Sequence, residues 1–412
     1  MVEVSRAAID PIVLPAPSAS TAEGVAIPGD VPRDRRRHFA CFDGYRAIAA
    51  ASIVVFHVAF FSGITFRHPV AGLFLARLDV GVSLFFVISG FLLYRPFVAA
   101  HLAGRAAPGT RTFLGRRVLR IVPAYWATLF FVVYVVGVVR IASVGDAIVY
   151  FCFLQIYDNR HLGGGINQAW SLCTEVSFYL ALPVYAWALR RSARRRRPAI
   201  VAEVVGVFAL YAGGLVVRTL IAYNGYTKTG DCRLDWLPAT MDLFALGMAL
   251  AVASAWHEQG GGMPRILALL GRYPWLSWAG AGAAYAVVST VVFTTRDIGN
   301  PFTPSQIVGR EALYGIIAVL LVIPGVFGPA GRGPIRRVLQ SKPFVWLGVI
   351  SYGVYLTHES FIDQLIRRFG LIPGHSETVR LLLAASLASI VAATLLHLLV
   401  ERPALQLKHR LG

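Results

Sequence analysis

A histidine stands deep inside the first long apolar stretch of this chain, ACFDGYRAIAAASIVVFHVAFFS at 40–62. On a helix, His57 would lie about 17 residues, or roughly 25 Å, from the start of that stretch, and Arg46 stands nearer its beginning. An arginine at the centre of a bilayer costs on the order of 3 kcal/mol, so such residues are expected to face a polar interior. An imidazole there can take a proton from an attacking hydroxyl, or can carry an acyl group as a nucleophile.

Other ionisable residues have the chemistry to assist such a reaction. Arg117 and Arg120 in GRRVLRIVPAYW come at the start of the third apolar stretch, and guanidinium forks match the oxygens of phosphate groups. Together with Arg46 they are predicted to hold a donor that carries phosphates. Glu175 in WSLCTEVSFYL and His358 in SYGVYLTHES are candidates to orient the imidazole of the first stretch or to relay its proton.

The composition places these residues in a membrane protein. Of the 412 residues 56% are hydrophobic and only 15% are charged, and the mean hydropathy is +0.62. This balance is typical of a polytopic membrane protein rather than a soluble enzyme. The net charge of +18 is explained by basic residues on cytoplasmic loops, so nucleic acid is not an expected partner. The four cysteines have no metal-ligand spacing, so no metal site is expected, and a disulfide among Cys152, Cys173 and Cys232 would require that they face an oxidising compartment.

The elements that position these residues are predicted to be about ten transmembrane helices, in an all-α fold with a central polar cavity. The apolar stretches long enough to span a bilayer lie at 40–62, 79–95, 118–139, 170–189, 198–222, 237–256, 275–294, 308–328, 344–364 and 378–400. The stretch 147–157 is too short to span and is predicted to be an interfacial or re-entrant piece. The membrane domain is expected to cover 40–403, with Pro403 ending the last helix, between a disordered tail at 1–39 and a short tail at 404–412.

The distribution of charge sets the predicted orientation. If both termini are cytoplasmic, the cytoplasmic segments carry most of the 39 Lys and Arg residues. His57, Glu175 and His358 then share the outer half of the membrane, and the three arginines lie toward the cytoplasm. The sequence thus predicts an outer acid–base cluster above an inner ring of cations. The alternative for Arg117 and Arg120 is that they only anchor the start of a helix.

Further polar residues within the apolar stretches are weaker candidates. Asp43 is expected to pair locally with the arginine three residues later. Asp242 is a lesser candidate for a site role, and Ser83 is a candidate to line the cavity. Ser89 and Gly90 in FFVISGFL are expected to let helix backbones approach closely.

Six motifs follow one another along nearly the whole chain. FDGYRAIAAASIVVFH places Arg46 and His57 eleven residues apart, and it is followed by DVGVSLFFVISGFLL, RRVLRIVPAYW, WSLCTEVSFYLALP, SYGVYLTHES and ERPALQL. In this order they resemble the motifs of the acyltransferase-3 family of integral membrane acyltransferases, and the resemblance covers about residues 40–403. It implies a catalytic role for His57 and essential roles for Arg46, Arg117 and Arg120.

The resemblance also implies an activity. Members of the family move acyl groups, commonly acetyl from acetyl-CoA, onto hydroxyls of envelope glycans, lipopolysaccharides, glycolipids or macrolides. Two places depart from the family's pattern. Ser83 stands where an acidic residue is frequent, and Thr357 and Glu359 flank a histidine where an aromatic residue and a proline are common.

The sequence therefore predicts a multi-pass enzyme of the plasma membrane that moves an acyl group from cytoplasmic acyl-CoA to a sugar or lipid hydroxyl of the cell envelope. Acyl-CoA, this acceptor and membrane lipids are the expected partners. Two alternatives stay open. In one, the chain is a transporter or flippase for a lipid-linked saccharide, although paired broken helices are not visible. In the other, it is a receptor for acylated sugars without catalysis.

Overall fold

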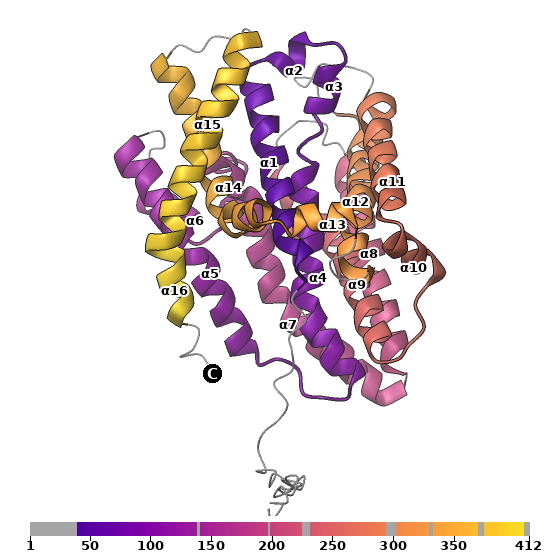
Figure 1. The fold of residues 1–412 in the computed structure, drawn as a ribbon. Coiled ribbons are helices and arrows are strands. Elements are labelled where there is room, and N and C mark those ends of the chain that lie inside the picture. Colours follow the sequence, from indigo (N-terminus) through magenta and orange to yellow (C-terminus); the bar gives the residue numbers. More distant parts are fainter. Residues whose placement is uncertain are drawn as a thin grey trace, which may run out of the picture. The chain divides into compact units, whose positions relative to one another are not determined.

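The computed structural model describes residues 39–137, 141–196, 198–224, 231–293, 302–328, 333–369 and 375–407. Within these ranges every regular element is helical (Figure 1). The prediction of an all-α fold is therefore confirmed for the part of the chain that the structure describes. The predicted tail at 1–39 lies outside it except for its last residue.

Ten long helices form the body of the bundle, and each lies on one of the predicted apolar stretches. They are α1 (Cys41–Phe61), α4 (Val80–Leu102), α5 (Thr110–Phe130), α7 (Trp170–Arg196), α8 (Ala199–Tyr223), α9 (Leu237–Glu258), α11 (Pro274–Val287), α12 (Pro304–Phe327), α14 (Lys342–Phe369) and α15 (His375–Leu396).

Shorter elements connect and extend these helices. They are α2 (Ile64–Arg67), α3 (Ala71–Leu75), α6 (Val144–Phe151), α10 (Arg265–Arg272), α13 (Pro334–Leu339) and α16 (Arg402–Gln406), the 3-10 turns η2 (Gln155–Tyr157), η3 (Asn167–Ala169) and η4 (Cys232–Asp235), and the π-helical turns η1 (Phe131–Val136), η5 (Val288–Val292) and η6 (His397–Glu401). The stretch 147–157 forms part of α6 and η2, which are too short to span, as predicted.

Nine segments of the described chain are long and apolar enough to cross a membrane, so the protein is a multi-pass membrane protein. The tenth predicted stretch, 344–364, lies in α14, which is not among the nine because polar residues such as His358 and Glu359 lower its hydropathy. α14 nevertheless packs against α1 and α15 within the bundle. The polar residues of α14 are part of the site described below.

Two helix ends differ from the sequence-based expectation. α5 begins at Thr110, well before residue 118, so Arg117 and Arg120 lie inside the helix rather than at its mouth. The expected end at Pro403 is wrong, because the chain continues through η6 into α16. Pro403 stands in the first turn of α16, where the missing N–H of a proline has no helical partner to lose.

The helices that support the site are held by close backbone contacts. A Cβ atom on Gly90 of α4 would overlap the carbonyl oxygen of Phe244 on α9, and one on Gly247 of α9 would overlap the carbonyl oxygen of Val87 on α4. These reciprocal glycines draw the two backbones together, as small residues do in membrane bundles. The expectation for Gly90 is thereby confirmed.

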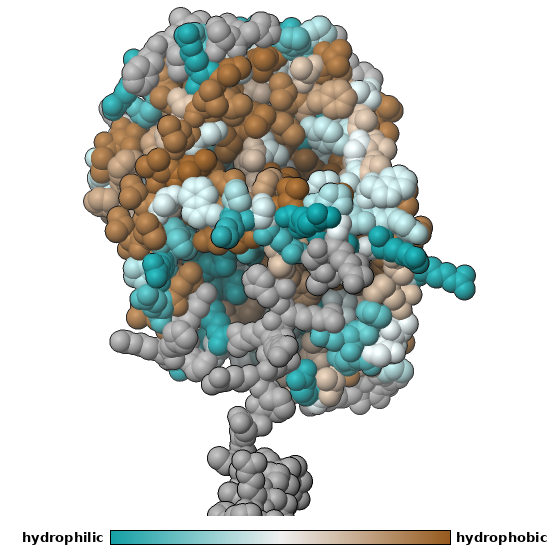
Figure 2. Space-filling model, in the orientation of Figure 1, coloured by the Kyte–Doolittle hydropathy of each residue, from teal (hydrophilic) through white to brown (hydrophobic). Residues whose placement is uncertain are grey.

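The lipid-facing surface is apolar. Large exposed side chains follow α15 and η6, among them Leu383, Leu387, Leu395 and Leu399. Figure 2 shows hydrophobic residues covering the upper part of this face, where α15 lies, and hydrophilic residues gathered below them. Apolar side chains on this surface are compatible with lipid tails. Polar and charged residues inside a membrane bundle are costly, so those found there are candidates for a functional role.

The glycine contact predicts a difference between two matched substitutions. Gly247→Ala should lower stability by about 1–3 kcal/mol, because overpacking at a backbone contact forces the helices apart. Gly213→Ala on α8, where no atom lies within 4 Å of the added Cβ, should be neutral or stabilising. Thermal unfolding of the two purified variants in the same detergent measures this. Equal melting temperatures would contradict the close α4–α9 contact.

Candidate active site

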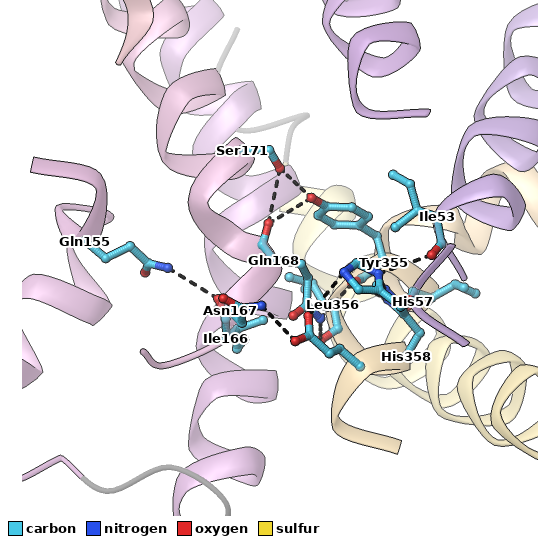
Figure 3. A network of polar contacts seen from close by, with 12 residues as sticks. Ile53, His57, Gln155, Ile166, Asn167, Gln168, Ser171, Tyr355, Leu356 and His358 are labelled. Atoms are coloured by element: carbon cyan, nitrogen blue, oxygen red, sulfur yellow. Dashed lines mark hydrogen bonds and ion pairs between the residues drawn. The ribbon is translucent and has the colours of Figure 1, made fainter. Parts of the chain in front are cut away.

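Two histidines meet inside the bundle. His57 of α1 and His358 of α14 lie with Nδ1 of His57 3.0 Å from Nε2 of His358 (Figure 3). His358 is fully buried, and the side chain of His57 is 16% exposed. The structure thus brings together two of the three residues predicted to form an acid–base cluster.

The backbone of α14 determines which nitrogens of this pair carry protons. Nδ1 of His358 lies 2.9 Å from the carbonyl oxygen of Tyr355 and 3.1 Å from that of Val354, and carbonyls only accept. Nδ1 of His358 must therefore donate, which leaves Nε2 of a neutral His358 as an acceptor. His57 then donates from Nδ1, which is also 3.2 Å from the carbonyl oxygen of Ile53. The consequence is that Nε2 of neutral His57 keeps a free lone pair.

An acidic residue next to His358 completes this arrangement. Oε2 of Glu359 lies 3.8 Å from Nε2 of His57 and has no hydrogen-bond partner among the described residues. Its other oxygen accepts a hydrogen bond of 2.7 Å from Asn167. A protonated His57 would therefore face a carboxylate. Sequence reasoning noted Glu359 only as a departure from the family's pattern, although its place beside His358 was a usable signal.

The loop before α7 anchors this part of α14. The side-chain amide of Gln168 in η3 donates to the carbonyl oxygens of Tyr355 and Leu356, at 3.0 and 2.9 Å. The hydroxyl of Tyr355 in turn donates to the carbonyl oxygen of Gln168 at 2.8 Å, and Ser171 lies 2.6 Å from that hydroxyl. Figure 3 shows these groups clustered beside the histidine pair. The residues that fix His358 thus come from a loop far away in the sequence.

The predicted arginines line a second part of the interior. Arg46, Arg117 and Arg120 border a cavity of about 220 Å³, which we call the arginine chamber. Arg46 forms an ion pair of 2.7 Å with Asp43, which confirms the local pairing expected for that carboxylate. Among the described residues, no carboxylate lies within ion-pair distance of Arg117 or Arg120. The chamber therefore offers cations to an anionic ligand.

Glu175 lies in the arginine chamber and not beside the histidines. It accepts a hydrogen bond from Ser89. The turn η3, which directly precedes α7, lies at the level of His358, because Gln168 donates to two carbonyl oxygens of α14. Glu175 is seven residues beyond Gln168, on the order of 10 Å further along the helix. The structure therefore does not bring Glu175 into the acid–base cluster.

His57 faces a different cavity of about 280 Å³, which we call the histidine chamber. Besides His57 its wall includes Asp79, Ser83, Trp170, Arg218, Asp235, Arg310 and Glu311. Ser83 lines the cavity as expected, whereas the charged residues of this wall other than His57 were not predicted. They stand near the ends of apolar stretches, where charge is common, and only the packing of several helices places them together.

The two chambers adjoin. Val82, Phe86 and Tyr355 line both of them, so these three side chains form the wall between the arginines and His57. The sequence predicts one central polar cavity, whereas in the described part of the chain the arginine chamber and the histidine chamber are separate cavities that share a wall.

Asp242 belongs to a buried ion pair rather than to a chamber wall. Both nitrogens of the Arg218 fork donate to its carboxylate, one at 3.0 Å, and the side chains are 2% and 4% exposed. The structure thus gives Asp242 a partner on α8 that the sequence did not indicate.

The polar residues elsewhere in the described chain add no metal-binding group. No set of three or more His, Cys, Asp or Glu side chains in these ranges is arranged to hold a metal ion. The four cysteines, all of which the structure describes, are free thiols.

Comparison with known proteins matches this architecture to one family. The family model described as an acyltransferase domain, that of the acyltransferase-3 family, matches residues 39–398. The chain belongs to the acyltransferase-3 family. The resemblance carried by the six motifs is thereby confirmed.

Several curated proteins are similar to this chain at low sequence identity. The chain is 24% identical over 345 residues to the peptidoglycan O-acetyltransferase OatA of Listeria monocytogenes, which covers 80% of this chain and 50% of that protein. It is 27% identical over 361 residues to the acyltransferase MdmB of Streptomyces mycarofaciens, covering 81% and 82%. It is 28% identical over 340 residues to the exopolysaccharide production protein ExoZ of Rhizobium meliloti, covering 79% and 89%.

These relatives differ in extent. The chain spans about half the length of the peptidoglycan O-acetyltransferase from Listeria and of its putative counterpart in Bacillus subtilis. No solved structure matches the chain.

The buried pair of Arg218 and Asp242 predicts an asymmetry among variants. Arg218→Met should destabilise the protein by about 3–5 kcal/mol, because it leaves a carboxylate buried without a partner. Adding Asp242→Leu should recover most of that loss, since neither charge then remains. Thermal unfolding in detergent of the single and double variants tests this. A double variant as unstable as the single one would show that the pair does not act as a unit.

Proposed function

We propose that this membrane protein transfers an acyl group, most simply acetyl, from an acyl-CoA thioester to a hydroxyl of a cell-envelope glycan or glycolipid. One observation carries the proposal: His57, whose Nε2 keeps a free lone pair, lines a cavity that adjoins a cavity lined by three arginines. Membership of the acyltransferase-3 family and the likeness to O-acetyltransferases support it.

The arginine chamber is the proposed site of the donor. Arg46, Arg117 and Arg120 would bind phosphate oxygens of the CoA moiety, because guanidinium groups match them in geometry and charge. The chamber is smaller than the roughly 300–1,000 Å³ of pockets that enclose drug-sized ligands, so only part of the donor would fit inside it. The thioester end would pass the wall at Val82, Phe86 and Tyr355 to reach His57.

The histidine chamber is the proposed site of the reaction. Nε2 of His57 accepts the proton of the acceptor hydroxyl, and the oxygen forms a bond to the thioester carbonyl carbon. The C–S bond then breaks, and the thiolate of CoA takes the proton from His57. A variant of this path places the acyl group on Nε2 of His57 first and on the hydroxyl second.

The other ionisable residues near the two chambers act through position and charge in this scheme. His358 holds His57 in the tautomer that leaves Nε2 basic, and Glu359 stabilises the imidazolium that forms. Glu175 supports the arginine side chains of its own chamber and does not relay the proton of His57, because it lies on the other side of the wall.

The proposed orientation is the one predicted from charge. The arginine chamber would face the cytoplasm, where acyl-CoA is made, and the histidine chamber would face the outer side of the plasma membrane. Both termini would then be cytoplasmic.

Removing the base should abolish transfer without removing donor binding. His57→Ala is expected to lower the turnover of acyl transfer by about 10²–10⁴-fold, since it removes a general base. Purified protein, radiolabelled acetyl-CoA and an envelope extract provide the assay, and binding of acetyl-CoA should remain within about twofold. His257→Ala, at an exposed histidine at the end of α9, is the matched control. Full transfer by the His57 variant would refute the assigned role.

Removing a phosphate-binding arginine should act on the donor. Arg120→Gln is expected to raise the KM for acyl-CoA by tenfold or more, because a hydrogen bond to a charged group is lost. Arg111→Gln, at an exposed arginine of the same helix, should leave KM unchanged. An unchanged KM in the Arg120 variant would contradict the donor site. Movement of unmodified saccharide across vesicles without any CoA release would instead favour the transporter alternative.

A further inference from the structure

The histidine chamber carries charges that the transfer chemistry does not use. Its wall includes the carboxylates of Asp79, Asp235 and Glu311 and the guanidinium groups of Arg218 and Arg310. Because they surround the space in front of His57, they decide which acceptors can be held there.

Both arginines of this wall are already paired. Arg310 lies 2.9 Å from Glu311 and 3.8 Å from Asp79. Both terminal nitrogens of the Arg218 guanidinium donate hydrogen bonds to the carboxylate of Asp242. The wall therefore has no unpaired cation for a phosphate or carboxylate group of an acceptor.

Unlike these two arginines, Asp235 is, within the described ranges, an unpaired charged residue of the chamber wall. It lines the chamber, and its carboxylate has no hydrogen-bond or ion-pair partner among the described residues. Its backbone is nevertheless fixed on both sides, because its carbonyl oxygen accepts a hydrogen bond of 2.5 Å from Thr174, and the indole of Trp236 donates to Ile156 at 2.6 Å. The main chain at Asp235 is thus anchored, and its carboxylate stands in the cavity wall without a hydrogen-bond donor among the described residues.

Apolar surface stands in the same wall. Trp170, Phe56 and Phe86 line the chamber together with the carboxylates. Aromatic rings can pack against the apolar face of a sugar ring, whose hydroxyls at the rim then donate to carboxylate oxygens.

We infer that the histidine chamber selects an uncharged polyhydroxyl acceptor, a neutral sugar unit, and that Asp235 binds it by accepting hydrogen bonds from its hydroxyls. This inference rests on the proposed function and names the class of its acceptor. An anionic sugar would meet an unpaired carboxylate and would find no free cation. The two chambers thus separate the substrates by charge, with the anionic donor among arginines and the neutral acceptor among carboxylates.

Fractionation of the acceptor by charge tests the inference. Envelope glycans and glycolipids are separated by anion exchange into a neutral and an anionic fraction, and each is incubated with the full-length protein and radiolabelled acetyl-CoA. We expect label in the neutral fraction. Label mainly in the anionic fraction would overturn the acceptor class while leaving the proposed function standing. Label in neither fraction would contradict the proposed function itself.

Variants of Asp235 test the residue. Asp235→Asn should raise the KM for the neutral fraction by roughly ten- to a hundredfold, as expected for lost hydrogen bonds to a charged group, with the KM for acetyl-CoA within about twofold. Asp158→Asn, on an aspartate that pairs with Arg160 outside the chamber, is the control and should change neither value. Asp235→Arg should lose the neutral fraction and gain label in the anionic one. An unchanged acceptor KM in the Asn variant would exclude Asp235 from the acceptor site.

Discussion

The direction of one hydrogen bond governs what this site can do. His57 can act as a base only if its Nδ1 carries the proton, and this depends on Nε2 of His358 being an acceptor. Two backbone carbonyls of α14 set this protonation, because carbonyl oxygens only accept hydrogen bonds and Nδ1 of His358 must therefore donate to them. The tautomer is thus fixed by main-chain atoms of a helix, which cannot rotate away as a side chain can. In a low-dielectric interior without bulk water, such a fixed arrangement needs no reorganisation when the proton moves.

The same constraint explains why α14 is less apolar than α1 and α15, the two helices it packs against. Lipid tails offer no hydrogen-bond partners to His358 and Glu359 at the centre of α14. The helix instead packs against α1 and α15, and its backbone accepts hydrogen bonds from Gln168. Those bonds come from η3, a loop that reaches the level of the histidines. The loop replaces water as the partner of polar groups that would otherwise be unsatisfied in the bundle. Stability and the geometry of the site therefore depend on the same contacts.

The sequence predicts those parts of the site that lie on long, regular helices. Depth along a regular helix places His57 and His358 at one level, and the arginines of α1 and α5 at another, and the structure brings each group together. Glu175 was expected beside the histidines because its depth was counted along the helix alone, whereas the packing of α4, α5 and α7 places it in the arginine chamber. Asp235 could not be found, because it lies in a short turn whose position depends on hydrogen bonds to α7 and η2. Regular periodicity predicts helices, but it does not predict how deep a loop enters between them.

Tyr355 connects the wall between the two chambers with the histidine pair. Tyr355 lines both cavities, and its hydroxyl is held by Gln168 and Ser171, the loop and helix start that also anchor α14. Its backbone carbonyl oxygen at the same time accepts a hydrogen bond from Nδ1 of His358. A change at this residue would therefore alter both the wall between the two chambers and the hydrogen bond that sets the tautomer of His57. Under the proposed function, the path of the donor and the reactive nitrogen of His57 thus depend on one residue, and the two chambers do not vary independently.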